Sequence, residues 1–160
     1  MQSNYHNLPL INGVPQKHGA TYKATQVQAD KRKNTFTANI ATAYPAEAEV
    51  ESWIRSYSLQ KGQLRISDSF RLTTAKQPNQ INFMTWGQVN TEIPGKIQLE
   101  VKGKKAFIEY DKQLFDVKTE TIPLTDPRLS NVWGKSIYRI TLTATNIYKT
   151  GNYSFIIKKQ

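Results

Sequence analysis

The sequence predicts an all-β protein, an antiparallel β-sandwich of about ten or more short strands with minimal helix. Apolar and polar residues alternate with period two in several stretches, which is the pattern of half-buried antiparallel strands. Turn signals separate these stretches, for example Gln77-Pro78-Asn79, Pro94-Gly95 and Thr150-Gly151-Asn152. The 160 residues contain no internal repeat or linker, and we expect one domain over residues 1–160.

The first predicted strand lies near the N-terminus, where Leu8-Pro9-Leu10-Ile11 leads into Asn12-Gly13, a typical two-residue hairpin turn. The only two histidines of the chain, His6 and His18, flank this stretch. Residues 41–53 have helical propensity, but Pro45 interrupts them. We therefore expect a single helical turn or a loop there.

The clearest alternation covers residues 64–72, preceded by a predicted strand at residues 52–60 and a tight turn at Lys61-Gly62. One face carries Leu64, Ile66, Phe70 and Leu72, and the other carries Arg65, Ser67, Ser69 and Arg71. Asp68 falls on the apolar face, where a carboxylate needs partners. We predict that it is a buried hydrogen-bond hub, bonded to a neighbouring backbone group or an arginine. Further strands are predicted at residues 81–86, 96–101, 106–110, 136–145 and 153–157.

The composition limits the functions that the chain can have. The formal net charge of +10 favours a polyanionic partner such as nucleic acid, acidic glycan or anionic membrane. The absence of cysteine excludes disulfides, thiolate metal sites and cysteine nucleophiles. No apolar run reaches membrane-spanning length, and the first residues lack the basic start and apolar stretch of a signal peptide.

Other common sites are also missing from the sequence. There is no Gly-rich phosphate loop, HExxH, GxSxG or EF-hand loop. Nucleic-acid binding is not favoured, because Phe70 and the arginines of residues 64–72 fall on opposite faces. His6 and His18 lack a third ligand for zinc. We therefore predict no metal and no cofactor.

A set of short motifs, in this order and spacing, resembles the C-terminal β-sandwich domain of the heparinase II/III-like polysaccharide lyases. The motifs are His6-Asn7, Pro9-Leu10-Ile11-Asn12-Gly13 and Gln16; Ala43-Tyr44-Pro45; Trp53 with Arg55; Asp68-Ser69-Phe70; Thr85-Trp86; Leu124-Thr125-Asp126-Pro127-Arg128-Leu129; Val132-Trp133-Gly134; and Tyr138-Arg139-Ile140.

The resemblance implies a periplasmic or secreted parent enzyme with an α-helical toroid before the sandwich and an active site between the two. It implies β-elimination on an acidic polysaccharide, and it matches His6 to a sandwich histidine that reaches the cleft. Some members bind zinc through two histidines and an aspartate, a site that we do not assign here. The toroid is absent from this chain, so we expect it to be inactive alone.

Arginine pairs well with sulfate and carboxylate groups, and we assign Arg55, Arg65 and Arg71 as candidate substrate-binding residues. Two alternatives to a lyase domain remain open at this point. The chain could be a stand-alone module that binds acidic glycans, or a structural domain without a ligand.

Overall fold

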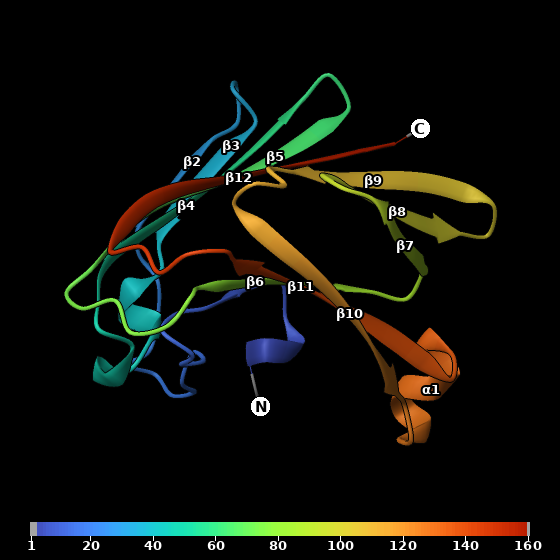
Figure 1. Ribbon diagram of the computed structural model, residues 1–160, viewed down its shortest axis with the longest axis horizontal. Coiled ribbons are helices and arrows are strands. Elements are labelled where there is room, and N and C mark those ends of the chain that lie inside the picture. Colours follow the sequence, from blue (N-terminus) through green and yellow to red (C-terminus); the bar gives the residue numbers. More distant parts are fainter. Residues whose placement is uncertain (1–2, 160) are drawn as a thin grey trace.

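Two antiparallel sheets that face each other make up the fold, as the sequence predicts (Figure 1). The computed structural model describes residues 3–159. The larger sheet contains, in spatial order, β2 (Thr25–Asp30), β3 (Thr35–Asn39), β4 (Val50–Gln60), β5 (Gln63–Leu72), β12 (Thr150–Lys159), β9 (Lys104–Tyr110), β8 (Lys96–Val101) and β7 (Gln88–Ile93). The smaller sheet contains β1 (Pro9–Leu10), β6 (Gln80–Thr85), β11 (Ser136–Ala144) and β10 (Phe115–Pro123).

The predicted hairpin turns form because their residues tolerate a left-handed backbone. Asn12 and Gly13 have φ values of 50° and 75°, and Lys61 and Gly62 have 50° and 74°. Positive φ at both central residues is the signature of the type I′ turn, whose twist matches that of paired strands. The first turn closes the bridge between Ile11 and Val14, and the second joins β4 to β5.

The alternation in β5 places its two faces as the sequence predicts. Ile66, Asp68 and Phe70 are buried, whereas Arg65 and Arg71 are exposed. The apolar face therefore points into the space between the sheets, and the arginines point outward from the larger sheet.

Aromatic rings fill the core between the sheets. The ring of Phe70 stacks on Trp53 with the centroids 4.7 Å apart and lies 4.9 Å from the ring of Tyr153. Phe115 of the smaller sheet makes an edge contact with Tyr153 at 4.7 Å. Phe83, also of the smaller sheet, packs edge-on against Phe155 at 5.4 Å. These contacts fix the two sheets to each other.

The helical content differs in part from the prediction. The turn expected near Pro45 is present as two 3₁₀ turns, η2 (Ala41–Ala43) and η3 (Ala46–Ala48). No helix is predicted after residue 125, but Asp126-Pro127 begins the helix α1 (Pro127–Trp133). The Asp126 side chain accepts a hydrogen bond from the Arg128 N–H, and proline is well suited to the first helical position.

Two helical elements contact the smaller sheet. The first is η1 (Ser3–Tyr5), which contacts β6, and the second is α1, which contacts β11. Figure 1 shows both elements on the side of this sheet that faces away from the larger sheet. Within residues 3–159, no helix is long and apolar enough to span a membrane.

Candidate functional site

His6 lies on a short stretch at the N-terminus, residues 3–8, which we call the N-terminal segment. Local hydrogen bonds give it a defined shape. The His6 N–H donates to the carbonyl of Ser3 at 3.0 Å, and the Leu8 N–H donates to the carbonyl of His6 at 2.8 Å. The Ser3 hydroxyl accepts from the N–H of Gln16 at 2.8 Å, which ties the segment to the chain that follows the first hairpin.

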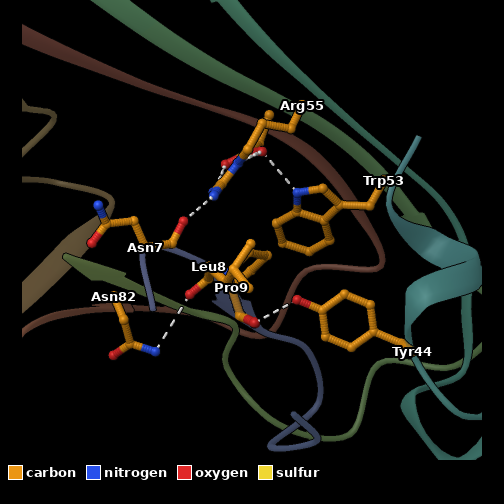
Figure 2. A network of polar contacts seen from close by, with 8 residues as sticks. Asn7, Leu8, Pro9, Tyr44, Trp53, Arg55 and Asn82 are labelled. Atoms are coloured by element: carbon orange, nitrogen blue, oxygen red, sulfur yellow. Dashed lines mark hydrogen bonds and ion pairs between the residues drawn. The ribbon is translucent and has the colours of Figure 1, made fainter. Parts of the chain in front are cut away.

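The N-terminal segment is bonded along the edge of β6. The Met84 N–H donates to the side-chain oxygen of Asn7 at 2.7 Å. The carbonyl of Leu8 accepts from the backbone N–H of Asn82 at 3.2 Å and from its side-chain amide at 3.4 Å, a contact drawn in Figure 2. The segment therefore extends the pairing of β1 with β6 toward His6.

A buried ion pair on the larger sheet supports the same segment. Arg55 of β4 faces Asp68 of β5, and both residues are almost fully buried, at 2% and 1% exposure. Two hydrogen bonds join them, from Nε at 2.7 Å and from Nη2 at 2.6 Å. The third nitrogen, Nη1, donates to the carbonyl of Asn7 at 3.0 Å. Arg55 thus reaches across from the larger sheet to the residue next to His6 (Figure 2).

Two more donors complete this network. The indole N–H of Trp53 donates to Asp68 at 2.8 Å, so Asp68 is the hydrogen-bond hub predicted from the sequence. The Tyr44 hydroxyl donates to the carbonyl of Pro9 at 2.6 Å (Figure 2).

The charges of the network follow from its environment. Burial by itself would lower the pKa of Arg55, but the charge and hydrogen bonds of Asp68 raise it overall, so the guanidinium stays charged. Burial raises the pKa of Tyr44 well above its ordinary value, so its hydroxyl keeps the proton that it donates to Pro9.

Both histidines line one surface hollow with a volume of about 250 Å³. Its other lining residues are Ser3, Leu8, Gln16 and Lys17. His6, His18 and Lys17 are exposed. The first hairpin therefore brings together two imidazoles and an ammonium group, which can pair with an anion. Among residues 3–159, no group of three His, Cys, Asp or Glu side chains could hold a metal ion.

The three arginines assigned from the sequence do not form one site with His6. Arg55 is buried in the sandwich interior, where its guanidinium donors face Asp68 and Asn7. Arg65 and Arg71 lie on the outer face of β5 and point away from Asp68. The sheet itself therefore separates these two arginines from the N-terminal segment.

Sequence reasoning weighed His18 with His6 only as a possible zinc pair, and it did not assign Lys17 to the site. The available signal was the short hairpin at Asn12-Gly13, which turns the chain back toward the residues that precede it. The contact from Arg55 to Asn7 had no comparable signal, because 48 residues separate the two in sequence.

No protein-family model matches the chain, and no curated protein sequence matches it significantly. Its structure is similar to that of the heparan sulfate lyase HepC from Pedobacter heparinus, with a TM-score of 0.70 and 12% sequence identity over 99% of this chain. A mutant of the same lyase gives a TM-score of 0.69, also at 12% identity. In both comparisons the chain spans 24% of the lyase. At 12% identity the similarity shows the fold alone. The chain has the fold of one part of a polysaccharide lyase, so the resemblance inferred from the sequence motifs is confirmed for the fold.

Proposed function

We propose that the chain is the sandwich domain of a lyase that cleaves acidic polysaccharides, and that His6 acts at a cleft completed by an α-toroid domain. The observation that carries this proposal is the position of His6, exposed beside His18 and Lys17 on a segment bonded to both sheets. The fold shared with part of a heparan sulfate lyase supports it. An enzyme with such a substrate would work in the periplasm or outside the cell.

The reaction is β-elimination at a uronic acid. A base removes the proton from C5, the bond between C4 and the bridging oxygen breaks, a C4–C5 double bond forms, and an acid protonates the leaving oxygen. The carboxylate must be neutralised so that charge can develop next to C5. His6 offers an imidazole for one proton transfer, and Lys17 offers a cation for the carboxylate. One histidine cannot perform all these tasks, so the isolated chain should be inactive.

A fusion tests the proposal. The chain joined to the toroid domain of a related lyase should release unsaturated sugars from an acidic polysaccharide, detected by their ultraviolet absorbance. His6→Ala should lower the rate by roughly 10²–10⁴-fold, the usual loss for an acid–base group. Arg32→Ala serves as a control in the exposed turn after β2, and should leave the rate unchanged. An active fusion indifferent to His6→Ala would remove His6 from the mechanism.

A second candidate function is binding of an acidic glycan without cleavage, on the outer face of the larger sheet. Arg65 and Arg71 are exposed there. Between them a row of hydroxyl side chains crosses four neighbouring strands in register: Thr37, Ser56, Ser67 and Ser154. Hydroxyls can hydrogen-bond to sugars, and arginine can pair with sulfate or carboxylate.

A heparin column separates this binding function from a structural domain without a ligand. Binding at the outer face predicts that Arg65→Ala/Arg71→Ala elutes at clearly lower salt than the parent chain. The matched control, Lys31→Ala/Arg32→Ala, removes the same charge from the turn after β2 and should shift elution less. If both double variants lower the elution salt equally, a specific site at this face is excluded. The same holds if the parent chain itself elutes at the low salt typical of weak ion exchange.

A further inference from the structure

A second hollow lies on the outer face of the smaller sheet, and two exposed tryptophans line it. Its volume is about 250 Å³. Trp86 and Trp133 are 43% and 47% exposed, and their rings meet edge to face with centroids 6.3 Å apart. Leu129 and Ile137 complete the apolar wall. Contiguous exposed apolar side chains are candidates for a binding surface.

The fold builds this hollow from three elements. Trp86 directly follows β6, Ile137 belongs to β11, and Trp133 is the last residue of α1. Helix α1 contacts β11 with one side, and its other side faces solvent. Val132 on that side is 68% exposed. Trp133 therefore belongs to a helix and Trp86 adjoins a strand, so regular elements place both residues at this face.

Lysines border the tryptophans. The Nζ atom of Lys102 lies 6.0 Å from the ring centroid of Trp86. A neighbouring hollow, which shares Thr85 with the first, is lined by Lys104, Lys105 and Lys159. The surface therefore combines an apolar aromatic wall with several cations at its edge.

We propose that the hollow at Trp86 and Trp133 is a subsite for one sugar ring of an acidic glycan, and that Lys102 and its neighbouring lysines pair with the carboxylate or sulfate of that ring. A pyranose ring presents an apolar C–H face that packs on indole, and a uronate or sulfated sugar carries an anion at its rim. A purely apolar ligand would leave the lysines without a partner, and a simple anion would leave the tryptophans unused.

The position of the hollow relative to His6 favours a glycan over another aromatic-stacking polyanion, and this step rests on the proposed function. Met84 lines the hollow, and its N–H is bonded to Asn7, the neighbour of His6. Arg139 of β11 lies opposite Met84, and its guanidinium is 5.1 Å from the ring centroid of Tyr5 in the N-terminal segment. One polymer lying along this face would reach both the histidine hollow and the tryptophan hollow.

Titration of the isolated chain with a heparan sulfate hexasaccharide tests the subsite, with intrinsic tryptophan fluorescence as the readout. We expect Trp86→Ala and Trp133→Ala each to weaken binding about tenfold, because each removes the apolar area that packs on the sugar. Lys102→Ala/Lys104→Ala should weaken binding and flatten its salt dependence. The control Leu59→Ala removes an exposed apolar side chain from β4 and should leave the affinity unchanged. A neutral hexasaccharide, maltohexaose, should bind more weakly than the sulfated one.

The outcomes separate this inference from the proposed function. The subsite is overturned if both tryptophan variants bind the hexasaccharide with unchanged affinity and circular dichroism shows that they are folded. This conclusion does not depend on whether the toroid fusion is active. Tryptophan-dependent binding together with a fusion that cleaves no acidic glycan supports the subsite and overturns the cleavage function. The glycan assignment is overturned if a single-stranded oligonucleotide binds more tightly than the hexasaccharide and this binding depends on the two tryptophans.

Discussion

Replacing Arg55 by methionine should strongly destabilise the protein, because it leaves a carboxylate unpaired in the core. Asp68 would keep only the indole N–H of Trp53 at 2.8 Å, and the carbonyl of Asn7 would lose the donor at 3.0 Å. Removing one partner of a buried ion pair costs about 3–5 kcal/mol, and the lost hydrogen bond to the Asn7 carbonyl adds to this. The total is a large fraction of the roughly 5–15 kcal/mol that stabilises a typical domain.

Urea unfolding followed by tryptophan fluorescence gives the free energy of unfolding for each variant. Arg55→Met/Asp68→Leu removes both charges and should recover much of the loss, although the Trp53 indole then lacks its acceptor. Arg65→Met is the matched control on the outer face and should stay within about 0.5 kcal/mol of the parent chain. A loss below about 1 kcal/mol for Arg55→Met would refute the reasoning, since it would mean that water or another cation reaches Asp68.

Two further predictions concern the aromatic core. Phe70→Ala should lower the free energy of unfolding by roughly 3–5 kcal/mol, because the ring stacks on Trp53 at 4.7 Å. The half-exposed Phe36→Ala is the control. A loss for Phe70→Ala as small as that of the control, near the roughly 0.5 kcal/mol of surface variants, would contradict the packing. Burial raises the pKa of Tyr153 to about 12, whereas an unfolded tyrosine ionises near pH 10. The unfolded chain therefore loses this proton first, so the stability present below about pH 10 should fall as the pH rises toward 12. Tyr153→Phe should show a weaker fall in unfolding free energy over this range, and an identical fall would count against the assignment.

Much of the architecture could be predicted because two-residue turns and alternation act locally. Lys61-Gly62 fixes the register of β4 against β5, and that register places Arg55 opposite Asp68. The prediction that Asp68 is a hub bonded to a neighbouring backbone group or an arginine therefore had a local physical basis. The assignment of Arg55 to substrate came from arginine chemistry without regard to this register, which places Arg55 in the buried ion pair.

Other elements could not be obtained from alternation. Strand β2 lies at the edge of the larger sheet and is mostly exposed, and Gln26 interrupts its register with a φ of 50°. A strand with little buried surface carries little hydrophobic pattern. The hollow at Trp86 and Trp133 joins residues that are 47 positions apart, and only the pairing of β6 with β11 brings their elements together.

The link from Arg55 to Asn7 changes how the N-terminal segment should fluctuate. Segments outside the central strands usually open and close at little free-energy cost. Here, lifting the N-terminal segment off β6 would also uncover a guanidinium and carboxylate that are otherwise sealed inside the sandwich. Local opening at His6 is thereby coupled to opening of the core, so the amide of Met84 should exchange with deuterium on the slow timescale of the central strands. Because the backbone at His6 is held in this way, a ligand that bound there would not have to order the segment first.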